Sequence, residues 1–271
     1  MKLNEIKLSA KEKAEEFVKR YVVVSALGVS ATCTVRDDGV IDVEKGDTPF
    51  MLANFKFTKL PVKFGIAEGN FFLSGLDKLE SLEGSPDEVK GEFSCYACTN
   101  LKSLKDSPRT VGSLDCSRCI SLTSFDGLPS VIKGSFRCHG CINLTSLKGV
   151  PTIINDYFNC SNCPSLTSFE GCPEKINSNF VANHCLSLNT LRFLPKEVNG
   201  IIFLKSCPNV RDYLNLLNVK GVTRIEITTD TKSSDMFRVQ EILNKYLPKH
   251  DMLNCQDELI EAGLEKYAEI D

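Results

Sequence analysis

Apolar and polar positions along most of this chain follow a frame that returns about every 22 residues. Each repeat can be aligned on a proline, and the six prolines are Pro86, Pro108, Pro129, Pro151, Pro173 and Pro195. They are separated by 22, 21, 22, 22 and 22 residues. A regular period of this length is typical of a solenoid, in which each repeat packs only against its neighbours.

The shared frame reads P-x-x-V-x-G-x-F-x-C-x-x-C-x-x-L-x-S-L-x-G-x-P. Its F-x-C segment predicts one short β-strand per repeat, whose alternate side chains point into the protein. No single repeat can bury that row, so we expect successive strands to stack into a parallel sheet over one continuous core. The repeat with Val111–Leu114 is one residue shorter before this strand, and we expect a loop to absorb the difference.

Four C-x-x-C pairs raise the question of a metal or redox site: Cys95/Cys98, Cys116/Cys119, Cys138/Cys141 and Cys160/Cys163. In other repeats the same positions hold Leu73, Leu76, Ala182 and Leu204. Leucine cannot replace a metal ligand, whereas it can replace a cysteine that packs as a small hydrophobe. We therefore predict core cysteines, with no metal or cofactor. Stacked strands lie about 4.8 Å apart, so spacing alone leaves a four-thiolate zinc site and disulfide or redox chemistry open.

The repeat occupies residues 56–210, and residues 1–55 precede it. In this N-terminal segment Ser9-x-x-Glu12 predicts a capping box that opens a helix. Thr32–Glu44 alternates around an Asp-Asp-Gly turn and predicts a β-hairpin. Because the first turn of a solenoid needs cover, we expect the helix and hairpin to form an N-terminal cap.

Residues 211–271 follow the repeat. We expect a last strand at Val222–Thr228, a helix near Ser234–Tyr246 that ends at Pro248, and a second amphipathic helix after it. These elements predict a C-terminal cap rich in α-helix. A small independent partner-binding module is the alternative for this segment.

Composition narrows the functional classes. The 271 residues are 42% apolar and 25% charged, with a formal net charge of -3, which disfavours a general nucleic-acid binder. No apolar run is long enough to cross a bilayer, and the first residues are too charged for a secretory signal. Thirteen cysteines, an odd number, favour reduced thiols. We expect a cytoplasmic protein that contacts neither nucleic acid nor membrane.

The F-x-C-x-x-C-x-x-L frame resembles the leucine-rich repeat. It departs from that repeat because two residues, not one, separate the second cysteine from the next leucine. The whole layout is similar to leucine-rich repeat proteins of large tailed bacteriophages, on the matching segments Phe57–Phe64, Leu144–Leu147 and Cys255–Gly263. This resemblance implies an α/β repeat solenoid with a parallel sheet. It also implies a phage-encoded protein that acts in the host cytoplasm through contacts with host or virion proteins.

Few residues indicate catalysis. The three histidines are His139, His184 and His250; His139 lies between two cysteines, and we expect it to be exposed on the sheet. Cys255-x-Asp257 resembles the C-x-D nucleophile motif of bacterial effector ubiquitin ligases, but too few residues follow the repeat for that catalytic domain. No phosphate-binding loop or HExxH motif is present. We predict that the protein is not an enzyme.

The outward side chains of the stacked strands form an exposed surface, and such surfaces bind partners in solenoids. Aromatic and arginine residues are enriched in interface hot spots. The candidate partner-binding residues are Phe72, Tyr96, Asp115, Arg137, His139, Tyr157, Asn159 and Phe203. The leading hypothesis is a non-catalytic scaffold that recognises a host or phage protein. The alternatives are a structural component of a virion or oligomer, and a C-terminal cysteine-dependent ligase.

Overall fold

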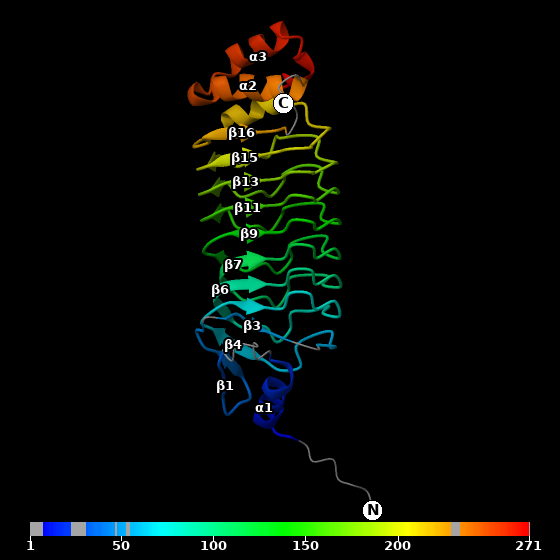
Figure 1. The fold of residues 1–271 in the computed structure, drawn as a ribbon, viewed down its shortest axis with the longest axis vertical. Helices are drawn as coiled ribbons and strands as arrows, with labels where there is room; N and C mark the ends of the chain where they lie inside the picture. The colour runs from blue at the N-terminus through cyan, green and yellow to red at the C-terminus, as the bar shows by residue number, and fades with distance from the viewer. Residues whose placement is uncertain (1–7, 23–30, 47, 53–54, 229–233, 271) are drawn as a thin grey trace, which may run out of the picture.

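The chain winds into a parallel β-solenoid of about eight turns. A computed structural model describes residues 8–22, 31–46, 48–52, 55–228 and 234–270. Figure 1 shows the turns stacked along the long axis, between a helix at one end and two helices at the other. These helices are α1 (Ala10–Tyr21), α2 (Asp235–Tyr246) and α3 (Met252–Glu261). The solenoid predicted from the repeat is confirmed.

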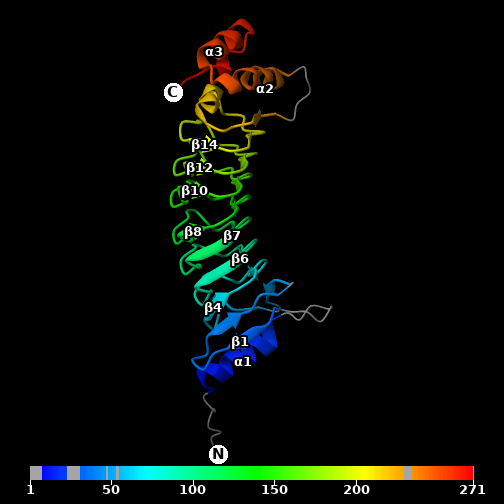
Figure 2. The same ribbon diagram turned by 90° about the vertical axis from the view of Figure 1, so that its left-hand side faces the viewer.

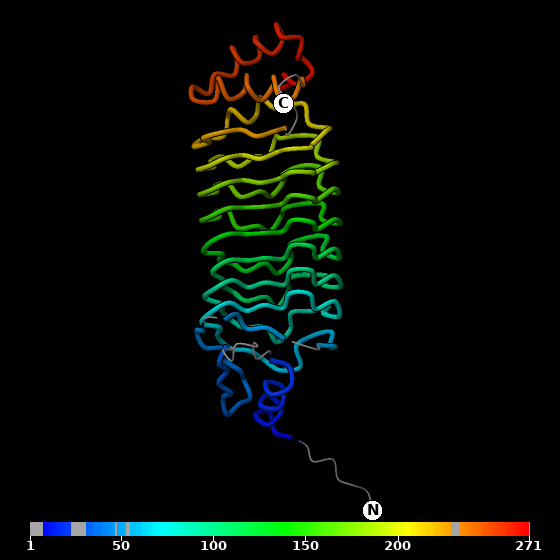
Figure 3. Tube along the Cα trace, viewed as in Figure 1, coloured from blue at the N-terminus to red at the C-terminus, as the bar shows by residue number. Residues whose placement is uncertain are grey.

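The F-x-C segments form one row of parallel strands, which we name the phenylalanine sheet. It contains β3 (Phe50–Met51), β5 (Phe71–Phe72), β9 (Phe136–Arg137), β11 (Phe158–Asn159), β13 (Phe180–Val181), β15 (Ile201–Phe203) and β16 (Arg224–Glu226). Partners in neighbouring turns are 22 residues apart, as in Phe158 opposite Phe180. The tube in Figure 3 shows how regularly the turns repeat.

A second row of strands lies on another side of the solenoid, so the expectation of one strand per repeat was wrong. This valine sheet contains β1 (Cys33–Val35), β2 (Ile41–Val43), β4 (Phe64–Ala67), β8 (Val131–Ile132), β10 (Ile153–Ile154), β12 (Lys175–Ile176) and β14 (Glu197–Val198). Figure 2 labels several of these strands along one side. They form because the V position of the frame supplies a second inward row, buried in every turn: Val89, Val111, Ile132, Ile154, Ile176 and Val198.

Two long strands, β6 (Glu88–Ser94) and β7 (Thr110–Asp115), run through both sheets and join them. Between them Val89 pairs with Val111 and Glu92 pairs with Ser113, so β6 has one residue more than β7 in this interval. The shorter repeat is therefore accommodated by a β-bulge within continuous strands. The expected loop is absent at this position, because β6 and β7 stay paired on both sides of the bulge.

The core is a single apolar column that runs through the turns. Its largest side chains stack along the axis: the ring centre of Phe158 lies 5.3 Å from Phe136 and 5.8 Å from Phe180, at interplanar angles of 19° and 13°. Leu114 takes the phenylalanine position in the shorter turn and is fully buried. Each turn therefore contributes side chains that only its neighbours can cover.

The N-terminal elements form as the sequence predicts. Ser9 and Glu12 make the reciprocal capping box of α1, and β1 pairs antiparallel with β2. Phe17 of α1 is buried, and its ring centre lies 6.1 Å from that of Phe64 in the first turns. The helix thereby places an apolar side chain against the end of the core.

The C-terminal elements also confirm the predicted strand and helices. β16 pairs with β15, and α2 begins at its N-cap residue Ser234. Two α2 side chains bond to the open edge of β16: Asn244 accepts from the Ile225 amide and donates to the Ile225 carbonyl, while Gln240 accepts from the Ile227 amide. Short 3-10 helices are η1 (Tyr213–Asn218), η2 (Leu247–Lys249) and η3 (Glu265–Tyr267).

The repeat region contains strands and turns but no helix between residues 55 and 210, all of which the structure describes. The expected α/β character is therefore found only at the ends of the chain. None of the described helices is long and apolar enough to cross a membrane.

Candidate binding surface on the phenylalanine sheet

Each C-x-x-C pair forms a corner at the end of a strand in the phenylalanine sheet. The residue before the second cysteine position has left-handed backbone, with φ between 56° and 73°, at Gly75, Ala97, Arg118, Gly140, Asn162, His184 and Ser206. The two residues between the cysteine positions therefore form a tight turn. His184 is an exposed residue of this corner.

The cysteine at the second position of each pair donates its thiol to a backbone carbonyl of the preceding turn. The donor–acceptor pairs, 3.0–3.4 Å apart, are Cys98–Leu73, Cys119–Cys95, Cys141–Cys116, Cys163–Cys138, Cys185–Cys160 and Cys207–Ala182. Burial raises the pKa of Cys98 and Cys185 to about 12, so these thiols keep the proton that they donate. This bond gives a reason for cysteine at Cys207, where the acceptor belongs to an alanine.

All thirteen cysteines are free thiols. Within the described residues, no three His, Cys, Asp or Glu side chains are gathered in a way that could hold a metal ion. The paired cysteines of the repeat are buried and pack in the core.

Replacing Cys119 with alanine should lower the free energy of unfolding by about 1.5–2.5 kcal/mol, because the Cys95 carbonyl loses the thiol donor and keeps only the Cys98 amide, and because a small cavity forms. The matched control is Cys160→Ala, because no thiol hydrogen bond of Cys160 is found in the described part of the chain and Ala182 fills this position one turn later. The control should cost about 1 kcal/mol. Urea unfolding followed by circular dichroism measures both. Equal losses, or zinc in native mass spectra, would contradict a hydrogen-bonding role.

The outward residues of the phenylalanine sheet lie in three rows along the solenoid axis. The middle row is given by the register, in which Ser94 is opposite Asp115 and Asp115 opposite Arg137. From turn to turn this row reads Phe72, Ser94, Asp115, Arg137, Asn159, Val181 and Phe203. The row before it contains Glu92 and Tyr157, and the row after it contains Tyr96 and His139. All eight residues predicted as the binding site therefore lie on one face.

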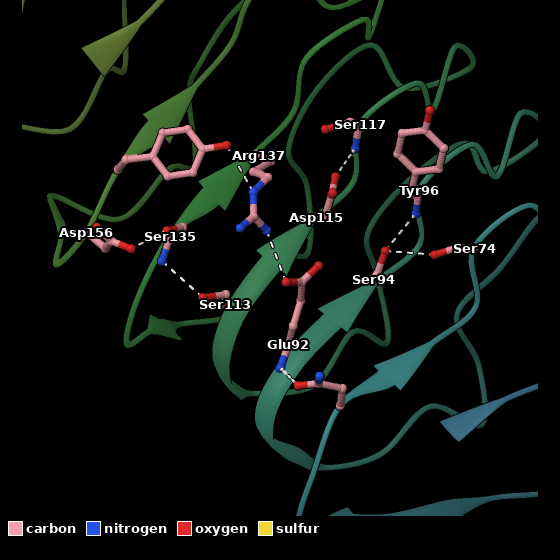
Figure 4. Close-up of polar contacts among 12 residues, drawn as sticks. Ser74, Glu92, Ser94, Tyr96, Ser113, Asp115, Ser117, Ser135, Arg137 and Asp156 are labelled. Carbon is pink, nitrogen blue, oxygen red and sulfur yellow. Dashed lines mark hydrogen bonds and ion pairs between the residues drawn. The ribbon is translucent and has the colours of Figure 1, made fainter. Parts of the chain in front are cut away.

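Arg137 is the centre of a polar cluster on this face (Figure 4). Its Nη1 donates to Glu92 Oε2 at 3.1 Å and its Nε donates to Tyr157 Oη at 3.0 Å. The guanidinium carbon lies 5.4 Å from the centre of the Tyr157 ring. The side chains of Arg137 and Glu92 are each only 27% exposed. The arginine is thus held in one orientation by contacts within the protein.

Glu92 was not among the predicted site residues. It precedes Arg137 by 45 residues, which is two turns and two positions in the sheet register. The long side chain of Arg137 reaches past β7 to β6 to make this contact, as Figure 4 shows. The repeat arithmetic places the two residues on one face, but only the side-chain rotamer of the arginine selects the glutamate.

A second cluster, Tyr96, Arg118 and His139, lies where the sheet meets the corner. The Arg118 guanidinium carbon is 5.7 Å from the centre of the Tyr96 ring, and the Tyr96 and His139 rings are 6.3 Å apart. His139 is half-buried rather than exposed as expected, and its Nδ1 is buried without a hydrogen-bond partner. Burial lowers the pKa of His139; Arg118 and Arg137 add to this effect, and Asp115 opposes it.

The remaining predicted residues have different surroundings. Asp115 Oδ1 accepts from the Ser117 amide at 2.8 Å, and Asn159 Oδ1 accepts from the Ser161 amide at 2.9 Å. Both side chains therefore stabilise local turns. Phe72 and Phe203 lie near opposite ends of the sheet, in β5 and β15. The structure brings Tyr96, Asp115, Arg137, His139 and Tyr157 together and leaves these two phenylalanines apart.

Many other polar side chains on this face bond to the neighbouring turn. Ser74 and Ser94 share a hydrogen bond, as Figure 4 shows, and Ser113 Oγ accepts from the Ser135 amide. Further along, Asn183 Oδ1 accepts from the Lys205 amide. These bonds join neighbouring turns of the sheet.

Cys255, the proposed nucleophile of the ligase alternative, is buried in α3. Burial, together with smaller effects of Glu258 and Asp251, raises the pKa of Cys255 to about 12. A thiol of this kind stays protonated at neutral pH, whereas a nucleophilic cysteine needs thiolate character.

His250 Nδ1 lies 2.6 Å from the Leu217 carbonyl oxygen, in a contact that joins two C-terminal elements.

No protein-family model, curated protein or solved structure matches this chain. The surface geometry is therefore what bears on function.

Proposed function

We propose that the protein is a non-catalytic recognition scaffold that binds a protein partner through the centre of the phenylalanine sheet. The observation that carries the proposal is Arg137 held between Glu92 and Tyr157 on an outward sheet face. Pre-organised arginine and tyrosine side chains are the residues that most often dominate binding energy in protein interfaces. The buried, protonated Cys255 supports a role without thiol catalysis.

We further propose that the terminal elements cap a solenoid of leucine-rich-repeat type. The capping role is supported by Phe17 packed on Phe64 at one end, and by Asn244 and Gln240 bonded to β16 at the other. A blocked edge strand resists pairing with other chains. The resemblance of the repeat frame to phage proteins supports a host or phage protein as the partner, in the host cytoplasm.

A structural role in a virion or oligomer is the second candidate. It is favoured by ion pairs that join neighbouring turns along the stack, such as Lys102 with Glu80, Lys148 with Glu170 and Lys175 with Glu197. A rigid solenoid whose neighbouring turns are joined by ion pairs would serve as a spacer or joint.

The test is affinity capture from a lysate of the producing cells, with the triple variant Tyr96→Ala/Arg137→Ala/Tyr157→Ala. The matched control carries Lys133→Ala/Ile153→Ala/Lys175→Ala on the outward side of the valine sheet. Circular dichroism first establishes that both variants fold. We expect the sheet variant to lose the partner and the control to keep it.

Retention of the partner by both variants would contradict recognition through this face. Absence of any soluble partner, together with the protein in purified particles, would support the structural role instead.

A further inference from the structure

Arg118 differs from the other cations on this side of the molecule. Arg137 pairs with Glu92, and Lys205 pairs with Glu226. Within the described residues Arg118 forms no ion pair with a carboxylate, although its side chain is exposed. Its guanidinium instead lies against the Tyr96 ring. Stacking on an aromatic ring leaves the N–H donors at the edge of a guanidinium available for a planar acceptor.

His139 places a second donor beside Arg118. The two residues lie on adjacent turns, because the Arg118 amide donates to the His139 carbonyl at 2.8 Å. Nδ1 is the buried nitrogen of His139 without a partner. Nε2 is then the better place for the proton, since there it can bond to water or to a bound group. The neutral ring therefore offers an N–H toward the surface.

An apolar ridge runs along the same corner. The residues Ile120, Ile142 and Leu186 are 37%, 44% and 52% exposed. Ile120 follows Arg118 with only the buried Cys119 between them, and both residues are exposed at this corner. Asn143, next to Ile142, donates its side-chain amide to the Ile120 carbonyl at 2.8 Å, which ties the two isoleucine turns together.

We propose that Tyr96, Arg118 and His139 bind a carboxylate side chain of the protein partner, and that Ile120 and Ile142 receive an apolar residue beside it. Arg118 supplies paired N–H donors to the two carboxylate oxygens, Tyr96 orients the guanidinium, and His139 donates from Nε2. The proposal rests on the proposed function and names the chemistry of its partner.

A nucleic acid fits this surface less well than an acidic protein segment. Asp115 and Glu92 lie close to the cluster and would repel a row of phosphates, and the chain has a net charge of -3. A single carboxylate next to an apolar side chain meets one free guanidinium without needing further cations.

The experiment selects binders from a library of short random peptides on the purified full chain. Enriched peptides are expected to carry Asp or Glu beside an apolar residue. Calorimetry then compares wild type, Arg118→Gln and the control Arg109→Gln, which removes an exposed arginine near the start of β7. Arg118→Gln should weaken binding about tenfold or more, and the control should leave it unchanged. Replacing the acidic peptide residue by its amide should cost the same, and both changes together no more.

Several results would overturn the inference. Enriched peptides without acidic residues, or unchanged affinity for Arg118→Gln, exclude the carboxylate site. If such peptides still lose affinity with Arg137→Ala or Tyr157→Ala, the recognition function stands and only the carboxylate site fails. If no variant of this face changes binding, or no peptide is enriched, both fail. Single-stranded DNA that binds wild type but not Arg118→Gln, with peptides unaffected, would identify a phosphate ligand instead.

Discussion

Replacing Phe158 with alanine is expected to lower the free energy of unfolding by about 3–5 kcal/mol. Phe158 is fully buried and stacks on Phe136 in one neighbouring turn and on Phe180 in the other. Turns of a solenoid are stabilised only by their neighbours, so the cavity weakens two interfaces at once. The lost ring contacts add to the loss of buried apolar area.

The matched variants for this experiment are Phe158→Leu and Phe72→Ala. Leucine occupies the same inward position in the shorter turn, at Leu114, and should cost about 1–1.5 kcal/mol. Phe72 points outward in the same sheet and is only partly buried, so its truncation should cost clearly less than that of Phe158. Guanidinium unfolding followed by far-ultraviolet circular dichroism measures all three. A loss below about 1 kcal/mol for Phe158→Ala would contradict the stacked core.

Replacing Gly171 with alanine is expected to cost about 2–5 kcal/mol, from strained backbone and from overpacking together. Gly171 has a φ of +86°, and a Cβ built on it would lie 2.6 Å from the Leu147 carbonyl carbon in the preceding turn. Because backbone atoms cannot move aside without separating the turns, the methyl group would push the two coils apart.

Gly75→Ala separates the two causes. Gly75 has a φ of +73°, and a Cβ there would meet nothing within 4 Å. Its replacement by alanine should therefore show the backbone cost alone, about 1–2 kcal/mol. Thermal and urea unfolding of both variants provides the comparison. Equal costs for Gly75→Ala and Gly171→Ala would show that close packing of the turns does not restrict the residue type at Gly171.

The elements at the ends of the chain were predictable because local chemistry decides them. The capping box of Ser9 and Glu12 and the N-cap at Ser234 form with neighbours three residues away. The bulge between β6 and β7 was not predictable, because it depends on how two whole turns align. The second sheet was within reach of the sequence, since the V position repeats as regularly as the F position.

The candidate site was predictable only as a face. Repeat arithmetic places Tyr96, Arg137 and Tyr157 on one side of the stack, whichever rotamers they adopt. It does not select Glu92 as the partner of Arg137, and it gives no sign that Arg118 forms no ion pair among the residues that the structure describes. Those facts depend on how far each side chain reaches across neighbouring turns.

By itself, the sequence determined the period, the inward rows and the place of the cysteines in the core. A 22-residue repeat places equivalent residues in equivalent surroundings. The residue types found at one position in the other repeats therefore show what that position accepts. Only the tertiary structure decided that each second-position thiol donates to a carbonyl one turn earlier, and that His139 buries one nitrogen on the turn next to Arg118. The reason is physical: these contacts join residues more than twenty positions apart, and only the packed turns set the distances between them.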